Sequence, residues 1–150
     1  MPILSGAKDL SCEMKNLETI KKRYLQDDLQ VRLGGIAANL ARIASFSSDP
    51  VDWEAVQSTL EESKFFIEWA APEAPLNVKT FLVELQIQLA LWHRVWPQVY
   101  ANPQEREKLS QLARTWSQNV LMLREQEFPR LTRWLRVFFP RTESIGTKSG

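Results

Sequence analysis

His93 is the only histidine in the chain, and an imidazole supports several kinds of chemistry. A neutral imidazole ligates haem iron and other metals in many proteins. Trp92 and Trp96 lie beside it, and Trp116 comes from a later part of the chain. An aromatic or tetrapyrrole-like ligand could bind among these rings, with the imidazole as an axial ligand. A lone histidine beside an apolar stripe is more often a packed or surface residue, so the pocket of Trp92, His93, Trp96 and Trp116 is the alternative hypothesis.

Other catalytic and metal-binding patterns are missing. Di-iron carboxylate proteins need Glu-x-x-His pairs, but Ala90 stands three residues before His93. Cys12 is the only cysteine, so an intrachain disulfide and a thiolate metal cluster are both excluded. The adjacent pair Glu61 and Glu62 would point to different sides of a helix, which argues against a carboxylate dyad. The sequence therefore predicts no catalytic residue, no metal site, no cofactor and a non-enzymatic protein.

The composition is that of an ordinary helical domain. The chain has 150 residues, of which 44% are apolar and 25% charged, and this length buries roughly two thirds of the surface of the unfolded chain. Only 5 residues are glycine, and strict alternation of apolar and polar residues is scarce, so an all-α fold is expected. The net charge of +1 gives no general attraction to nucleic acid.

The strongest helical pattern lies between residues 77 and 96 and continues to Val99. Apolar residues recur there at steps of three and four, which places them along one helical stripe. This stripe contains Val78, Leu82, Leu85, Leu89, Trp92, Trp96 and Val99. A second apolar row, Val83, Ile87 and Leu91, projects from the opposite side of the same helix. We therefore expect this helix to be packed between neighbours on two sides.

Three further long helices are expected, at residues 16–46, 50–70 and 103–127. Short links between the four helices favour sequential antiparallel packing. The predicted fold is an antiparallel bundle of four main helices plus a short C-terminal amphipathic helix at 130–139. Gly34 and Gly35 should bend the first helix or allow another backbone to approach it closely.

Polar residues and prolines set the expected helix ends. Asp49 suits the N-cap of the second helix, with Pro50 at its first position, and Asn77 suits the N-cap of the third. Pro97 should kink or stop the third helix because it cannot donate to the carbonyl of His93. Asn102 should cap the fourth helix.

The segment 130–139 carries aromatic residues on one arc and basic residues on the other. The apolar arc contains Leu131, Trp134, Leu135, Phe138 and Phe139, and the basic arc contains Arg130, Arg133 and Arg136. Three interpretations are open. The segment could cover the bundle as a lid, for example on the second apolar row. It could instead form a protein interface, or insert at an anionic membrane surface, although it is short for that role.

The remaining parts of the chain define the expected domain boundaries. Residues 1–15 should be a flexible leader, 16–139 a single helical domain and 140–150 a disordered tail. Met14 is an alternative start. The sequence shows neither a secretory signal nor an apolar run of about 18 residues, so a cytoplasmic protein is expected.

Three stretches within about residues 30 to 125 carry a family resemblance. They are LARIASF from Leu40, LEESKFFIEW from Leu60 and VELQIQLALW from Val83. These stretches resemble small all-helical cyanobacterial proteins of uncharacterised function. The resemblance implies a host lineage and carries over no activity or functional residue.

The exposed aromatic and apolar positions make protein binding the leading hypothesis. Trp69 and Trp134 lie near the ends of predicted helices, where an indole could meet a partner. Together with the row Val83, Ile87 and Leu91, they are the candidates for an interaction surface. We expect a protein partner or a homo-oligomer. Nucleic acid is disfavoured, and peripheral membrane contact is a minor alternative.

Overall fold

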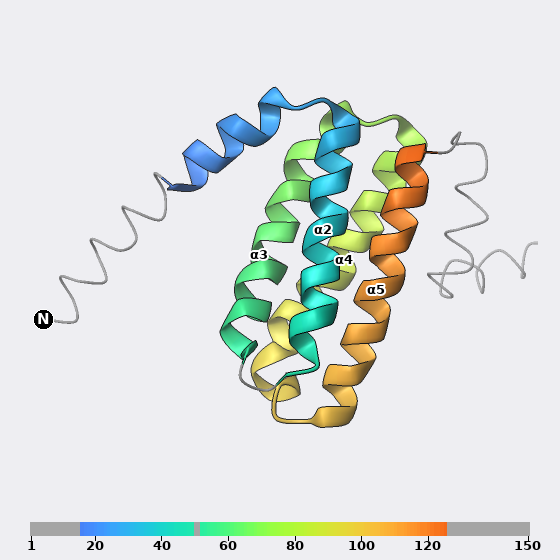
Figure 1. Cartoon of the computed structure of the whole chain (residues 1–150). Helices are drawn as coiled ribbons and strands as arrows, with labels where there is room; N and C mark the ends of the chain where they lie inside the picture. Colours follow the sequence, from blue (N-terminus) through green and yellow to red (C-terminus); the bar gives the residue numbers. More distant parts are fainter. Residues whose placement is uncertain (1–15, 50–51, 126–150) are drawn as a thin grey trace, which may run out of the picture.

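The computed structural model describes residues 16–49 and 52–125, and this part of the chain is helical apart from short links (Figure 1). A helical segment at residues 16–26 precedes the main helices. The main elements are α2 (Leu29–Ser47), α3 (Trp53–Ala70), the short 3-10 helix η2 (Ala71–Glu73), α4 (Leu76–Val99) and α5 (Pro103–Glu125). The all-α prediction is therefore confirmed for the described residues. The predicted leader, the segment 130–139 with Arg130, Arg133 and Arg136, and the tail lie outside them.

The four long helices lie side by side around one core (Figure 1). α2 packs extensively against α5 and also against α3, whereas α4 packs against α3 and over a smaller area against α5. α2 and α4 share no contact of comparable extent. α4 therefore lies on the opposite side of the core from α2, and its junction with α5 is the least closely packed of the four.

The predicted apolar stripe of α4 is confirmed as core. Its side chains are buried, with the exception of the half-buried Trp92, and Phe81 joins them. The other helices supply the facing residues, chiefly Leu33, Ile36, Leu40, Ile43, Leu60, Ile67, Leu109 and Trp116. Burial of such large apolar side chains is the main favourable contribution to folding, at about 1.5–3 kcal/mol each.

Small residues and serine hydroxyl groups line the junction of α2 and α5. The Ser110 hydroxyl donates a 2.6 Å hydrogen bond to the carbonyl of Ala44, and the Ser117 hydroxyl donates one of 2.8 Å to that of Ala37. These bonds cross between two helices and satisfy hydroxyl groups that are buried. They help to explain why α2 approaches α5 so closely.

The helix α2 continues through Gly34 and Gly35, and the atoms that a Cβ there would meet belong to side chains and not to the backbone of another helix. A Cβ atom at Gly34 would lie 2.8 Å from Nη1 of Arg124, which is the far end of a flexible side chain. A Cβ atom at Gly35 would meet Tyr24 and Phe66 at ordinary distances of 3.6 Å and more.

Gly35→Ala should therefore stabilise the protein. The new methyl group fits, and alanine removes part of the backbone entropy that glycine loses in a helix, so we expect a gain of about 0.5–1 kcal/mol in the free energy of unfolding. Urea denaturation of the variant and the parent checks this. A loss of stability would show that the space beside Tyr24 and Phe66 is smaller than the structure indicates.

The prediction of one continuous helix over 16–46 is wrong. The chain bends at Asp27 and Asp28, and α2 begins anew at Leu29. The carboxylate of Asp28 accepts a 3.0 Å hydrogen bond from the amide of Val31, which is the N-cap geometry that aspartate favours. The apolar spacing continues across the bend, which is why periodicity alone did not reveal it.

The predicted N-cap of α4 at Asn77 and its predicted end at residue 96 are also wrong. The helix begins at Leu76 with Pro75 as its N-cap instead of Asn77, and it runs through Pro97 to Val99. The amide of Tyr100 donates a 2.9 Å hydrogen bond to the carbonyl of Trp96, so helical bonding resumes directly after the proline. Trp96 and Val99 are buried, and their packing offsets the one hydrogen bond that Pro97 removes.

The starts of α3 and α5 test the remaining cap predictions. α3 begins at Trp53 after Asp52, later than predicted, and Pro50 lies outside the described residues. The Asn102 cap of α5 is confirmed, because its side-chain oxygen accepts hydrogen bonds from the amides of Gln104 at 3.0 Å and Glu105 at 3.3 Å.

Candidate interaction surface

The outward side of α4 carries an unbroken row of half-exposed aliphatic side chains. Val83, Ile87 and Leu91 are 45%, 41% and 50% exposed, and Val95 continues the row at 42%. Steps of four residues align these side chains along about 18 Å of the helix. We call these four residues the α4 ridge. Among the described residues, α4 packs against α3 and α5 along its flanks, and no helix covers the ridge. The prediction that this second row is packed against a neighbour is therefore wrong for the described residues.

A surface cavity borders the ridge on the side of α3. Its volume is about 370 Å³, and Phe65, Gln86 and Ile87 contribute to its walls. Glu61 and Glu68 also line it, and they make this border acidic. Lys64 is the cation at the same cavity, but its ammonium group lies 2.9 Å from Nδ1 of His93. On the α3 side, the ridge is therefore bordered by both apolar side chains and carboxylates.

A second cavity borders the ridge on the side of α5. Its volume is about 400 Å³, and Leu91, Trp92, Val95 and Val99 form its apolar wall. It lies where α4 and α5 pack over a small area. The ridge is thus flanked by a hollow on each side, which is a shape that an additional helix can occupy.

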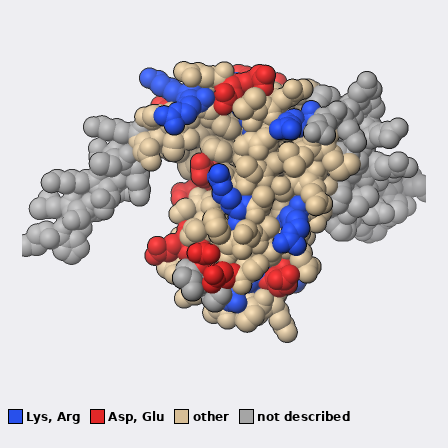
Figure 2. Space-filling view, viewed as in Figure 1, with Lys and Arg blue, Asp and Glu red and all other residues tan. Residues whose placement is uncertain are grey.

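The face built around α2 differs from the α4 face. In Figure 2 lysine, arginine, aspartate and glutamate side chains are scattered among uncharged ones over the side that α2, α3 and α5 present. Both signs are mixed, as is usual for a surface in contact with water. The row of four aliphatic residues on α4 continues over four successive positions, with Arg94 beside Leu91 and Val95 at the cavity toward α5, so α4 is the better candidate for a binding surface.

Trp69, predicted for an interaction surface, packs against other residues of the same chain. It lies 5.9 Å from the ring of Tyr24 and 5.7 Å from that of Phe65, centroid to centroid, and Lys21 places its ammonium 5.9 Å from the indole. Tyr24 also stacks on Phe66 at 4.3 Å. The indole therefore helps to hold the segment 16–26 against α3. The other tryptophan predicted for an interaction surface, Trp134, lies outside the described residues.

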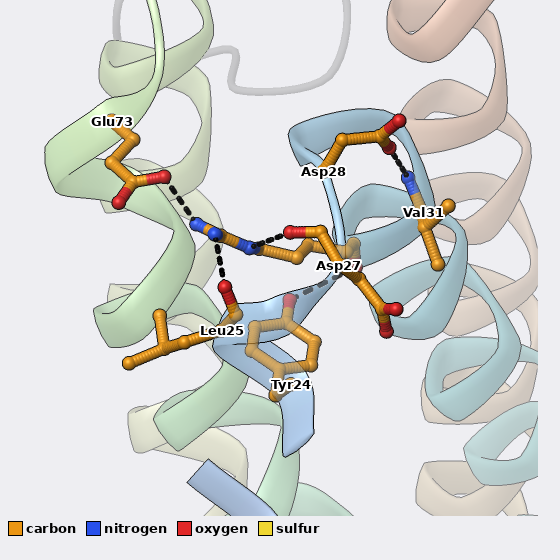
Figure 3. Close-up of polar contacts among 7 residues, drawn as sticks. Tyr24, Leu25, Asp27, Asp28, Val31 and Glu73 are labelled. Atoms are coloured by element: carbon orange, nitrogen blue, oxygen red, sulfur yellow. Dashed lines mark hydrogen bonds and ion pairs between the residues drawn. The ribbon is translucent and has the colours of Figure 1, made fainter. Parts of the chain in front are cut away.

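Arg32 holds the same segment from the side of α2, and sequence reasoning missed it (Figure 3). Its side chain is 5% exposed. Nε donates to the carbonyl of Asp27 at 2.8 Å and Nη2 to that of Leu25 at 2.9 Å, while Nη1 contacts Oε2 of Glu73 at 2.6 Å. The i,i+4 spacing of Asp28 and Arg32 in the sequence predicts an exposed ion pair instead. The bend at Asp27 was the missing information, because it turns the backbone carbonyls toward the guanidinium.

Tyr24 completes this contact. Its hydroxyl donates a 2.9 Å hydrogen bond to the carbonyl of Arg32. Burial raises the pKa of Tyr24 above its ordinary value, more than the nearby Arg32 lowers it, so the phenol remains a neutral donor. The segment 16–26 is therefore attached to the four long helices by aromatic packing and by a buried guanidinium.

The residues of the predicted aromatic pocket fall in different environments. Trp96 and Trp116 are 1% and 2% exposed and belong to the core. The indole N–H of Trp96 donates a 2.8 Å hydrogen bond to the carbonyl of Trp53. Trp92 is half-buried and lines the cavity toward α5, whereas His93 faces Lys64 on the α3 side. The structure does not bring the four side chains to one cavity among those described here.

His93 gives a testable pH dependence. Partial burial lowers its pKa below the ordinary value of 6.5, the ammonium of Lys64 lowers it further, and Glu61 opposes both. The unfolded chain therefore binds a proton more readily than the folded one. The contribution of His93 to stability is complete above pH 6.5 and is lost as the pH falls from 6.5 through the lower pKa of the folded state.

Urea unfolding between about pH 5 and pH 8 should show this loss in the native chain, and His93→Gln should remove it. The difference between the two curves is the informative quantity, because both chains carry the same other ionisable groups. Two curves that stay parallel through this range would contradict the assigned pKa direction.

Neither a cluster of metal ligands nor a helix that could span a membrane is found in the described residues. Among them, no group of three or more histidine, cysteine, aspartate or glutamate side chains is arranged to hold a metal ion. Within the same residues, every helix is too short or too polar to cross a lipid bilayer. The chain matches no protein-family model, no curated protein sequence and no solved structure.

Proposed function

We propose that this chain is a non-enzymatic protein–protein interaction or regulatory protein, and that the α4 ridge binds an amphipathic helix of another polypeptide. One observation carries the proposal: four consecutive outward positions of α4 are aliphatic and 41–50% exposed. Water contact with such a row is unfavourable, and rows of this kind on globular proteins often mark binding sites.

The fold suits this role as a rigid support. We propose that α2, α3, α4 and α5 form an antiparallel four-helix bundle, with the segment 130–139 as an additional amphipathic helix. The core stripe of α4 is buried against its neighbours, so the ridge is held at a fixed position. A preformed surface loses little conformational entropy when a partner binds. A cytoplasmic location and a cyanobacterial origin of the chain are also part of this proposal.

The expected partner has a helix with an apolar stripe and basic residues at its edge. The apolar stripe would cover the ridge and enter the two flanking cavities. Basic side chains would meet Glu61 and Glu68 on the α3 border. This arrangement is the usual one for a helix that binds in a groove, with anchors at steps of three and four residues.

Site-specific photo-cross-linking in living cells tests the proposal. A photoreactive amino acid replaces Leu91 in one variant and Ala38, which is exposed on α2, in the matched control. We expect position 91 to cross-link to a second polypeptide, either a partner or a mass-labelled copy of the chain. Mass spectrometry should place the attachment in an amphipathic helical peptide, and Ile87→Glu should abolish it.

Two results would overturn the proposal. Position 91 would form no cross-link to a second polypeptide, or positions 91 and 38 would give the same products in the same yield. Each result would mean that the ridge is not selectively covered by another chain.

A small-molecule site is the second candidate, and the cavity toward α5 favours it. Its volume of about 400 Å³ falls within the range of known ligand pockets. Its wall of Leu91, Trp92 and Val95 is apolar and aromatic, as the walls of such pockets usually are. A tetrapyrrole-like ligand would give a visible absorption band, and an aromatic ligand without colour would be released on denaturation and detected by mass spectrometry. We expect Trp92→Ala to remove the band or the released compound, and a purified chain with neither would dismiss this candidate.

A further inference from the structure

We propose that residues 130–139 of the same chain dock as an amphipathic helix on the α4 ridge and cover it until a partner helix displaces them. The inference rests on the proposed function, because it assigns an occupant and a mode of regulation to the same surface. The chain would thereby carry its own competitor for the partner.

The position where α5 ends supports this choice of occupant. Figure 1 shows the last turn of α5 beside the first turn of α4, and Glu125 is the last residue of α5. Five residues lie between Glu125 and Leu131, so the six steps from one Cα atom to the next can span up to about 20 Å. Val83, the first residue of the ridge, lies about 10 Å along α4 from Leu76. Packed helix axes are about 8–10 Å apart, so the segment can reach the ridge.

The dimensions and the apolar pattern also agree. A helix of ten residues is about 15 Å long, close to the 18 Å or so of the ridge. Its apolar arc presents two aliphatic and three aromatic side chains, namely Leu131, Leu135, Trp134, Phe138 and Phe139. Rings of this size can fill the hollows of about 370 Å³ and 400 Å³ on either side of the ridge.

Charge complementarity favours the same arrangement. Arg130 lies roughly 100° from the centre of the apolar arc, at its edge, so its side chain can extend sideways while the arc faces α4. Glu61 and Glu68 line the α3 border of the ridge. Lys64 lines the same border, and its ammonium lies 2.9 Å from Nδ1 of His93, so the two carboxylates against one ammonium leave the border with a net negative charge.

The size of the ridge argues for a segment of the same chain over a second copy. Four half-exposed aliphatic side chains offer on the order of 300 Å² of apolar surface. A stable dimer usually buries roughly 800 Å² on each partner. A tethered segment has an effective concentration in the millimolar range, so a smaller contact suffices.

Disulfide trapping in the full-length chain tests the inference. The native Cys12 is first changed to serine, and Ile87→Cys is then combined with Leu135→Cys. Both positions lie near the middle of their elements, so the pair can form whichever way the segment runs. The matched control combines Ala38→Cys on α2 with Leu135→Cys. Circular dichroism verifies the folding of each variant, and Leu91→Cys with Leu135→Cys serves as a second pair.

The expected result is an intramolecular disulfide that forms at least about tenfold faster for the Ile87 or Leu91 pair than for the Ala38 pair, independent of protein concentration. Equal rates for ridge and control pairs would overturn the inference. Disulfides that form at the ridge only between two chains would also overturn it, while leaving the proposed binding of another polypeptide intact. The photo-cross-linking experiment separates the two proposals in the other direction. Cross-links from position 91 only to the segment 130–139 of the same chain would support the inference and contradict the proposed function.

Discussion

Trp96→Ala should lower the free energy of unfolding by about 3–5 kcal/mol, the largest loss we expect from any single substitution in this chain. Trp96 is 1% exposed and fills the core near the end of α4. Its removal would leave a cavity between helices that cannot fully collapse. It would also deprive the carbonyl of Trp53 of its 2.8 Å hydrogen bond from the indole. Urea denaturation followed by circular dichroism measures the effect.

Trp96→Phe is the matched control, because it keeps most of the apolar volume and removes the indole N–H. We expect a loss of about 1–2 kcal/mol, from one hydrogen bond and a small reduction in packing. A loss for Trp96→Ala no larger than that for Trp96→Phe would show that packing around this ring contributes little.

Arg32→Ala should have the second-largest effect, a loss of about 3 kcal/mol. The guanidinium is almost fully buried and donates to two backbone carbonyls, those of Leu25 and Asp27. Without it these carbonyls lose their charged donor, and the segment 16–26 loses its attachment to α2. Hydrogen exchange should therefore accelerate in residues 16–26 more than in α5.

Glu73→Gln separates the ion pair from the carbonyl contacts. Glu73 is 62% exposed, and exposed ion pairs contribute little, so we expect a loss below about 1 kcal/mol. If the two variants lost the same stability, the ion pair with Glu73 would be the main contribution of Arg32, against our account.

Periodicity predicted the core but could not reveal the local features that bend the chain. The stripe of α4 and the Asn102 cap follow from spacing and from side-chain chemistry, and both are found in the structure. The bend at Asp28 went unnoticed because the apolar spacing continues across it and an aspartate can also occupy an exposed helical position. Arg32 gave no apolar signal, and its partners are mostly backbone carbonyls, which every sequence contains.

The α4 ridge shows what a single sequence leaves open about packing. Val83, Ile87 and Leu91 were recognised as a second apolar row, but the pattern is the same for a helix with two neighbours and for one with an unoccupied outer side. The number of neighbours depends on how the other helices are arranged. Pro97 illustrates the reverse case, since its local preference for a helix end is outweighed by the burial of Trp96 and Val99.

The reactivity of a cysteine placed on the ridge tests most directly whether this surface is a docking site. In a Cys12→Ser chain, Leu91→Cys and the matched Ala38→Cys are labelled with a maleimide in intact cells. If a helix covers the ridge, whether from this chain or another, position 91 should react at least about tenfold more slowly than position 38, although the two are both exposed in the described structure. Equal labelling rates in cells would contradict the account.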